Sequence, residues 1–386
     1  MAKNSPTNSK SIQKNIKTGI KPRVAVFYDW LNQWGGAEKV LLDILKAFPD
    51  AVLFTLVHDP SKTKWLPPNQ KVITSFLNRL PHAKNNPIYY TPFYDLATEQ
   101  FDFNNFDIII STTSTIGHTL LTPPHSLFVC YFHNINRYLY QTPRKYRILT
   151  PLLNLYKSLD QIYKYRPDYL FCNSQTVKKR ISRHFNRDAQ IIHPGINVNL
   201  FTPSKKLHNS QKYFLIVSRL VPHKKVDICI KACAQLGLNL KIVGTGRQYF
   251  QLEELIKNLN ADNIKLLGSV SQKKLIHLYQ NCQAIICPQL EDFGIVPLEA
   301  QACGKPVIAY NKGGVTETVI AGKTGLFFDH QTVVSLANIL KMFDSWNFSP
   351  QECHRNAKRF SDNNFVLHFK KSVLKLWLEK VKTTSL

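Results

Sequence analysis

Residues Cys287–Tyr310 read "CPQLEDFGIVPLEAQACGKPVIAY" and hold the end of an apolar run, a short acidic loop and a helical pattern. Pro297 in the first turn and Gly304 just past the end mark the limits of the predicted helix. Two of the chain's 25 acidic residues, Glu291 and Glu299, lie around the predicted start of this helix. A strand followed directly by a helix is the repeating unit of a parallel sheet, so this segment predicts an α/β fold.

The acidic loop has the groups needed to hold a sugar beside a phosphate. The amides of Gly294, Ile295 and Val296 are expected to be free donors at the helix start, where the helix dipole also favours an anion. A carboxylate accepts two hydrogen bonds side by side, which matches a vicinal diol, so Glu291 and Glu299 are candidates for sugar contacts. The combination predicts a nucleotide-sugar site. Taken singly, Glu299 is also explained as a first-turn acid and Glu291 as a solvated loop acid.

Short apolar runs alternate with helical patterns along the chain, which is typical of parallel sheets covered on both faces. We therefore expect two doubly wound, Rossmann-like α/β domains, with ligands bound in a cleft where the carboxyl ends of the strands face one another. The predicted strands of the first half are 23–29, 51–57, 106–112, 126–132, 168–174 and 189–195. Those of the second half are "YFLIVSR", "LKIVG", "IKLLGSV", "AIICPQ", "PVIAY" and "GLFF".

The polar, proline-containing segment 201–212 is the predicted linker between the domains. The expected organisation is a disordered basic tail over 1–21, an acceptor-side domain over 22–203, a nucleotide-sugar-binding domain over 204–362 and a C-terminal helix over 363–386 that returns to the first domain. A length of 386 residues fits two domains better than one core.

Composition points to anionic partners. Lys and Arg number 50, and the formal net charge is +25, which favours nucleic acid, an acidic membrane surface or phosphorylated substrates. The eight cysteines form no C-x-x-C pair and sit mostly in apolar runs, as expected for free thiols in a reducing compartment. No membrane span or secretory signal is visible, so we expect a cytoplasmic protein.

The longer stretch "EDFGIVPLEAQACGKPVIAYNKGGVTE" resembles the signature of the retaining glycosyltransferases of the GT-B fold, group 1 or family four. The resemblance runs from about Arg23 to the C-terminus. It implies transfer of a sugar from a nucleotide diphosphate donor, with Glu291 and Glu299 as the E-x7-E pair. The family is thought to use same-face attack, in which the leaving phosphate helps to deprotonate the acceptor hydroxyl. Domain closure is expected, with the linker and the C-terminal helix as hinges.

The segment "VSRLVPHKKVD" resembles the R-x4-K element of that family and assigns Arg219 and Lys224 to the donor diphosphate. Positioned cations stabilise the charge that develops on a leaving diphosphate. We expect no metal and no cofactor, because there is no D-x-D element to hold a metal. The alternative is that both residues belong to a general basic surface.

Two motifs of the first half complete the resemblance. Gly35 and Gly36, after the first strand, resemble the turn that approaches the donor diphosphate. "HNINRYLY" resembles an H-x-P-x-R-Y-L motif of mannosyltransferases that build O-antigen and related polysaccharides, with Asn136 in place of the proline. It implies that His133 lies beside the transferred sugar, where a neutral imidazole can bond a hydroxyl.

The resemblance thus predicts His133, Glu291, Arg219 and Lys224 as catalytic residues. Weaker matches place Gly244 and Gly246, and Val270 and Ser271, around the nucleobase. The predicted donor-binding residues are Gly35, Gly36, Arg219, Lys224, Gly244, Val270, Glu291, Phe293, Gly294, Ile295, Val296 and Glu299.

We expect a hexosyltransferase that moves mannose from GDP-mannose onto a lipid-linked or oligosaccharide acceptor in cell-surface glycan synthesis. Basic runs with tyrosines, such as "RYLYQTPRKYRIL" and "VKKRISRHFNR", favour contact with the inner face of a membrane. The alternatives are a UDP-sugar-dependent hexosyltransferase and a non-catalytic protein that binds nucleic acid or sugar nucleotides. We find no sequence context for the pyridoxal phosphate lysine of a GT-B phosphorylase.

Overall fold

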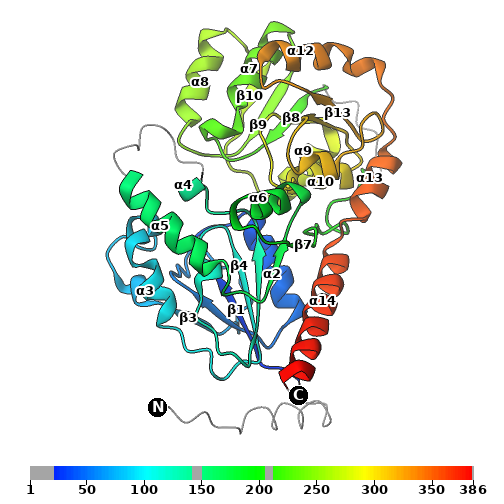
Figure 1. Cartoon of the computed structure of the whole chain (residues 1–386). Helices are drawn as coiled ribbons and strands as arrows, with labels where there is room; N and C mark the ends of the chain where they lie inside the picture. Colours follow the sequence, from blue (N-terminus) through cyan, green and yellow to red (C-terminus); the bar gives the residue numbers. More distant parts are fainter. Residues whose placement is uncertain (1–20, 141–149, 205–211, 385–386) are drawn as a thin grey trace, which may run out of the picture. The chain divides into compact units, whose positions relative to one another are not determined.

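The computed structural model describes residues 21–140, 150–204 and 212–384. The chain divides into two compact units (Figure 1), one of residues 1–192 with 365–386 and one of residues 193–364. Each unit contains one parallel sheet with helices on both faces. This confirms the predicted α/β class with two doubly wound domains.

The sheet of the first unit has seven strands in the order β3-β2-β1-β4-β5-β6-β7, all parallel. Chain order runs outward in both directions from β1 and β4, which pair with Ala25 opposite Ile109. The boundary between these two strands is therefore the topological switch point of the unit. The strands are β1 (Val24–Tyr28), β2 (Val52–Thr55), β3 (Val72–Thr74), β4 (Ile108–Thr113), β5 (Leu127–Phe132), β6 (Tyr169–Cys172) and β7 (Gln190–Ile191).

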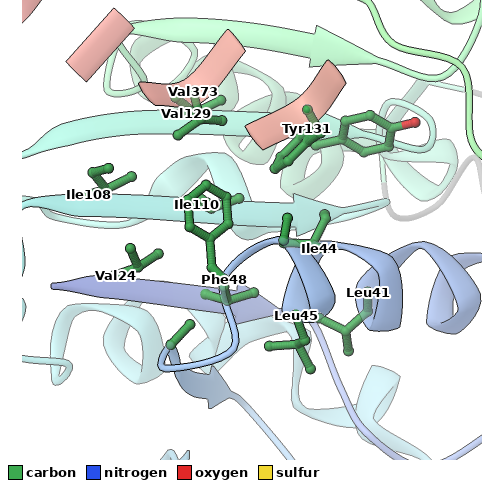
Figure 2. Close-up of a cluster of buried hydrophobic side chains, with 14 of the residues drawn as sticks. Val24, Leu41, Ile44, Leu45, Phe48, Ile108, Ile110, Val129, Tyr131 and Val373 are labelled. Atoms are coloured by element: carbon green, nitrogen blue, oxygen red, sulfur yellow. The ribbon is translucent and has the colours of Figure 1, made fainter. Parts of the chain in front are cut away.

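Alternate residues of each strand point to opposite faces of this sheet, and each face has its own core. Val24, Val26 and Tyr28 pack under α2 and α14 (Figure 2), while Ala25 and Phe27 pack under α3. The helices of the unit are α2 (Gly36–Ala47), η1 (Phe76–Arg79), η2 (Pro87–Phe93), α3 (Tyr94–Glu99), η3 (Gly117–Thr119), α4 (Arg137–Tyr140), α5 (Thr150–Tyr163), α6 (Gln175–Phe185) and α14 (Asp362–Thr384).

Helix α14 supplies part of the first unit's core although it ends the described chain. Its buried residues recur every four positions, so they form one stripe along the helix. The central one, Phe369, is fully buried and its ring contacts those of Phe48, Tyr131 and Phe171. The stripe consists of Phe365, Phe369, Val373, Trp377 and Val381.

The sheet of the second unit has six parallel strands in the order β10-β9-β8-β11-β12-β13. Its switch point lies between β8 and β11, where Leu215 pairs with Ile285. The strands are β8 (Phe214–Val217), β9 (Leu240–Val243), β10 (Ile264–Leu266), β11 (Ile285–Cys287), β12 (Val307–Tyr310) and β13 (Gly325–Phe328). All six coincide with predicted apolar runs.

Two helical layers cover this second sheet. One core lies under α7, α8 and α12, and the other lies under α9, α10 and α13. The helices are η5 (Pro222–Lys224), α7 (Val226–Gln235), α8 (Tyr249–Asn258), α9 (Gln272–Asn281), α10 (Ile295–Ala302), α11 (Val315–Thr318), α12 (Val333–Met342), η6 (Phe343–Ser345) and α13 (Pro350–Lys358).

The structure differs from the predicted domain boundary by about ten residues. The units divide between Ile192 and His193, not at 203, because Ile196 and Phe201 are buried in a core of the second unit. The backbone of Ile196 also exchanges hydrogen bonds with Phe360 and Asp362. Phe201 is thus a core residue and not part of a linker. Residues 205–211 of the predicted linker (201–212) and residues 1–20 of the predicted tail (1–21) lie outside the described residues.

Two further features concern the predicted compartment and one missed strand. All eight cysteines are buried and carry free thiols. Within the described ranges, no helix has both the length and the apolar character to cross a lipid bilayer.

The strand β3 was not predicted from the sequence, because it is only three residues long and half-buried.

We expect Phe369→Ala to lower the free energy of unfolding by about 3–5 kcal/mol, because it leaves a cavity among aromatic rings. Urea denaturation followed by circular dichroism measures this change. The matched control is Leu367→Ala on the outer side of α14, where the side chain is 68% exposed. Its cost should stay within about 0.5 kcal/mol. Equal losses in the two variants would contradict the assigned packing of α14.

Candidate active site

The switch point of each sheet is where an open α/β sheet binds its ligand, at the carboxyl ends of the strands. In the second unit, the loop after β8 carries Arg219 and Lys224, and the loop after β11 carries Glu291. These two strands are neighbours in the sheet. The topology therefore brings together three of the four predicted catalytic residues.

Lys224 and Glu291 form an ion pair across this switch point. The Nζ atom of Lys224 lies 2.9 Å from Oε1 of Glu291, and the two side chains are 16% and 19% exposed. Gln289 donates a second hydrogen bond to the same Oε1. Burial raises the pKa of the neighbouring Cys287 thiol; Glu291 adds to this rise and Lys224 opposes it. The predicted phosphate-binding cation and the predicted sugar-binding acid are thus direct partners.

Arg219 lies on the same loop as Lys224 but in a different setting. It is exposed, and its guanidinium makes no hydrogen bond or ion pair with the residues that the structure describes. An exposed guanidinium at a strand end is able to bind an incoming phosphate in the bidentate manner.

Helix α10 begins at Ile295, one residue before the predicted "VPLEAQACG", and Pro297 lies in its first turn as predicted. Gly294 precedes it with φ +106°, a conformation that other residues adopt only with strain. The amides of Ile295 and Val296 are therefore N-terminal donors, as predicted, while Pro297 has none.

The earlier helix start corrects the placement of Glu299. It is the fifth residue of α10 and not part of the first turn. Its side chain is buried and accepts a hydrogen bond from the hydroxyl of Tyr279 at 2.9 Å. Burial, and then Glu299, raise the pKa of that hydroxyl. Phe293 is also buried, with its ring stacked on His193. Contacts of Glu299 and Phe293 with a donor stay predictions.

Two glycines that the sequence reasoning did not assign hold the Glu291 loop. A Cβ atom on Gly313 would lie 2.3 Å from the carbonyl oxygen of Glu291, and one on Gly314 would lie 2.3 Å from that of Asp292. The amide of Gly314 donates to the carbonyl of Glu291 at 2.8 Å. The "KGG" triplet after β12 was the available signal for this contact.

A second close approach holds the Arg219 loop. A Cβ atom on Gly244 would lie 1.8 Å from the carbonyl oxygen of Ser218, and Gly246 abuts Leu220 in the same way. Both glycines were predicted near the nucleobase, and the structure shows them packed on the backbone of the loop that carries Arg219. Val270 is half-buried against the core, and Ser271 caps α9.

Gly35, Gly36 and His133 lie in the first unit. Gly36 is the first residue of α2, after Gly35 in extended conformation. A Cβ atom on Gly35 would approach the Glu38 carboxylate to 3.1 Å. Glu38 is buried and accepts a hydrogen bond from the Tyr28 hydroxyl at 2.7 Å. This turn is therefore packed against a buried acid.

His133 follows β5 and is fixed from several sides. Its Nε2 lies 2.8 Å from Oγ1 of Thr112, its amide donates to the carbonyl of Thr113, and Asn173 donates to its carbonyl. Nδ1 makes no hydrogen bond with a described residue. Burial lowers the pKa of the imidazole from 6.5 to about 4, so the ring is neutral near pH 7.

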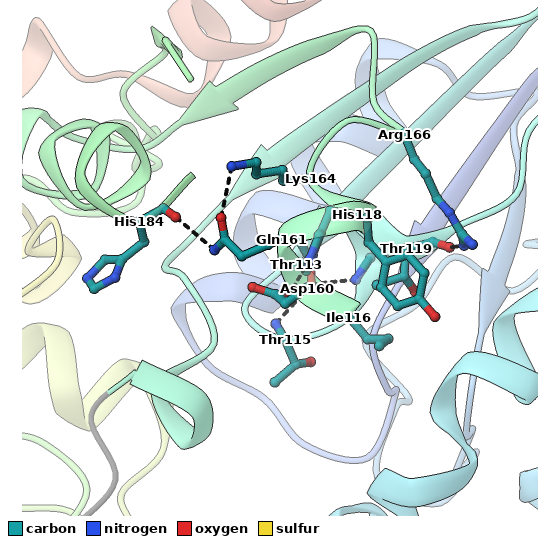
Figure 3. Close-up of polar contacts among 12 residues, drawn as sticks. Thr113, Thr115, Ile116, His118, Thr119, Asp160, Gln161, Lys164, Arg166 and His184 are labelled. Carbon is teal, nitrogen blue, oxygen red and sulfur yellow. Dashed lines mark hydrogen bonds and ion pairs between the residues drawn. The ribbon is translucent and has the colours of Figure 1, made fainter. Parts of the chain in front are cut away.

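Asp29, at the end of β1, was missed by the sequence reasoning. Its carboxylate accepts hydrogen bonds from the Thr113 hydroxyl at 2.6 Å and from the amides of Ser114 and Ile116. The Thr113 oxygen in turn accepts from the amides of Thr115 and Gly117 (Figure 3). Burial raises the pKa of the Asp29 carboxyl, and these hydrogen bonds oppose the rise. Four consecutive amides at the end of β4 are thus already bound.

A second polar network of the first unit fixes α5. Asp160 accepts hydrogen bonds from the Tyr140 hydroxyl at 2.6 Å and lies 2.7 Å from Nε2 of His118. Gln161 donates to the carbonyl of His184 on α6 (Figure 3). The network was not visible as a motif, since its members lie far apart in the sequence.

No group of three or more His, Cys, Asp or Glu in the described ranges is arranged to hold a metal ion.

Two protein-family models match this chain. Residues 199–360 match "Glycosyl transferases group 1" and residues 34–200 match "Glycosyltransferase Family 4". The two matches together span residues 34–360.

A curated relative from Corynebacterium glutamicum carries the name GDP-mannose-dependent monoacylated alpha-(1-6)-phosphatidylinositol monomannoside mannosyltransferase. It is 34% identical over 199 residues, which cover 45% of this chain and 52% of the relative. The chain spans about half the length of the curated relatives it matches.

Two solved structures share the fold. Sucrose-phosphate synthase from Thermosynechococcus elongatus superimposes with a TM-score of 0.77 at 19% identity, covering 92% of this chain and 100% of that one. HepE of Anabaena in complex with UDP gives a TM-score of 0.69 at 21% identity, with the same coverage.

We expect the stability of the protein to fall with acid through His133. Between pH 6.5 and about 4 the unfolded chain protonates this imidazole and the folded chain does not. The resulting loss is about 3 kcal/mol. Denaturation curves at pH 7 and at about pH 4 should therefore differ less for His133→Gln than for the wild type. His330→Gln, at an exposed position, controls for loss of an imidazole. An unaltered difference in His133→Gln would refute the assigned environment.

Proposed function

Because the chain belongs to the group 1 glycosyltransferases, we propose that it transfers a hexose from a nucleotide diphosphate to an acceptor hydroxyl with retention of configuration. The observation that carries the proposal is the Lys224–Glu291 pair beside the start of α10, at the switch point of the second sheet. A cation, an acid and free helix amides at one strand edge match the three parts of a sugar diphosphate.

The diphosphate is assigned to Arg219, Lys224 and the N-terminal amides of α10. Cleavage of the sugar–phosphate bond leaves additional negative charge on the phosphate oxygens. Fixed cations and amides stabilise that charge more in the transition state than in the bound donor, which lowers the barrier. Lys224 then exchanges Glu291 for phosphate, while the exposed Arg219 closes on the same group.

The sugar is assigned to Glu291 of the second unit, and a contact of His133 with the sugar stays a prediction of the resemblance. A carboxylate binds two neighbouring hydroxyls, and a neutral imidazole bonds a hydroxyl without adding charge near a developing oxocarbenium ion. The low pKa of His133 keeps it neutral across the physiological range. The leaving phosphate accepts the acceptor's proton, so no further basic side chain is needed for that step.

We assign mannose, from GDP-mannose, as the transferred sugar. The assignment is supported by the "HNINRYLY" likeness around His133 and by the printed name of the mannosyltransferase from Corynebacterium glutamicum. The alternative donor is a UDP-sugar, which the complex of Anabaena HepE with UDP favours. Because that structure shares only the fold, the relative carries more weight.

We further assign a lipid-linked saccharide as the acceptor and an anionic membrane surface as the place of reaction. Helix α5 exposes Leu155 and Ile162, the turn that follows it exposes Tyr165, and α6 exposes Lys179 and Arg183. Exposed apolar groups next to cations suit the boundary between headgroups and acyl chains. The net charge of +25 acts in the same direction.

A non-catalytic binding protein is the rival of a different class. It would bind a sugar nucleotide without releasing nucleoside diphosphate, or bind oligonucleotides in a salt-dependent manner independent of Glu291. Product release therefore separates the classes.

We expect GDP-mannose to give the fastest release of nucleoside diphosphate in a panel of GDP- and UDP-sugars, measured with a coupled assay. Turnover with UDP-sugars only would exclude mannose transfer from GDP-mannose, and no turnover with any donor would exclude an enzymatic function.

In Glu291→Gln, the release of nucleoside diphosphate should fall by about a hundredfold or more, because a carboxylate contact with the sugar is lost.

The matched control for that variant is Glu253→Gln on the exposed surface of α8. It makes the same chemical change away from the switch point and should keep the wild-type rate. Unchanged turnover in Glu291→Gln would remove Glu291 from the mechanism.

We expect the protein to sediment with vesicles of phosphatidylcholine containing phosphatidylglycerol and to stay in solution with phosphatidylcholine alone. The double variant Leu155→Ser and Ile162→Ser should reduce the bound fraction severalfold. Val334→Ser with Leu259→Ser removes exposed aliphatic groups from the second unit and serves as control. Equal binding by both double variants would refute the α5 surface.

A further inference from the structure

We propose that Gln289 is a positioning residue that holds the Glu291 carboxylate in its sugar-binding orientation while Lys224 turns to the diphosphate. The inference rests on the proposed function and adds a residue to the same site. Gln289 follows β11, is 3% exposed, and donates its side-chain N–H to Oε1 of Glu291.

Glu291 is fixed at both its backbone and its side chain. Its carbonyl accepts the amide of Gly314, in a parallel bridge with Gly313. Its Oε1 accepts from both Gln289 and Lys224. The last torsion of a glutamate is soft, so the direction of the other oxygen is set by what holds Oε1. Gln289 and Lys224 thus both hold Oε1 in its observed position.

Lys224 and Gln289, the two hydrogen-bond partners of Oε1, respond differently when the nucleotide sugar binds. Lys224 is a cation, and a diphosphate with its larger charge competes for it. Gln289 is neutral and buried, so a phosphate does not draw it away. When Lys224 moves, Gln289 is the contact that keeps Oε1 in place. A neutral donor also leaves the full negative charge of the carboxylate for the sugar hydroxyls.

The backbone of Gln289 is itself well anchored. The preceding carbonyl, of Pro288, accepts a hydrogen bond from the side chain of Gln331 at 2.7 Å. The side chain therefore extends from a fixed point of the sheet toward Glu291, as a positioning residue must.

The test compares Gln289→Glu and Gln289→Leu over a range from about pH 5 to pH 8. In Gln289→Glu two carboxyl groups lie within hydrogen-bond distance and cannot both ionise easily, so the pair retains a proton to higher pH. A protonated Glu at 289 donates as the amide does. We expect kcat/KM to fall about tenfold to a hundredfold at pH 8 and to recover toward the wild type near pH 5.

In Gln289→Leu the donor is absent at every pH, so the loss should not depend on pH. Binding of the nucleoside diphosphate alone, measured by calorimetry, should stay within about twofold of the wild type, because that ligand has no sugar. Gln251→Glu, at an exposed position of α8 in the same unit, is the control for the added charge. The titratable or charged groups around Glu291 in these profiles are Lys224 on η5, Cys287 on β11, and Asp292 and Lys312 in the adjoining loops.

Recovery in acid by Gln289→Glu together with a constant loss in Gln289→Leu supports the inference. A loss in Gln289→Glu that does not change with pH would assign Gln289 to packing alone and overturn it. Wild-type rates in both variants would overturn it as well, while leaving the proposed function intact. A wild-type protein that turns over no sugar nucleotide would overturn both. Thermal unfolding of each variant confirms that a folded protein is compared.

Discussion

The close approach of one backbone to another, at the carboxyl edge of the second sheet, is the constraint on which the candidate site depends. Gly244 abuts the carbonyl of Ser218, and Gly313 abuts that of Glu291. No side chain fits into either contact. The loop that carries the cations and the loop that carries the acid are therefore each held against the backbone of a second loop. An ion pair between their side chains then needs little further ordering.

The chain has few acids, and the first unit uses several of them internally. Asp29 binds the turn after β4, Glu38 accepts from Tyr28, and Asp160 joins His118 to Tyr140. Each buried carboxylate has hydrogen-bond donors, as burial of a charged group requires. In the first unit the amide-rich turn after β4 is already filled by a side chain of the protein itself. In the second unit the comparable edge presents Arg219 and helix amides.

Periodicity and glycine placement were enough to predict the parallel sheets, since apolar runs and strands coincide almost throughout. Local signals were less reliable where two explanations compete. Pro297 lies in the first turn as predicted, but the helix begins at Ile295 after Gly294, so Glu299 falls beyond the first turn and is buried. Contacts between distant positions, such as Asp29 with Thr113, have no sequence signal in a single chain. The contact of Gln289 with Glu291 was not predicted either, because the sequence does not show in which direction the Gln289 side chain points.

The return of α14 into the first unit has a consequence for biosynthesis. Phe48 and Phe171 emerge from a ribosome long before Phe369, their packing partner. The second unit is contiguous in the chain and has all of its strands and core helices before α14 is made. Vectorial synthesis thus leaves an apolar face of the earlier-made unit exposed until α14 has been made. The unit that starts first is completed last, and its unfinished surface is a natural target for chaperones in the interval.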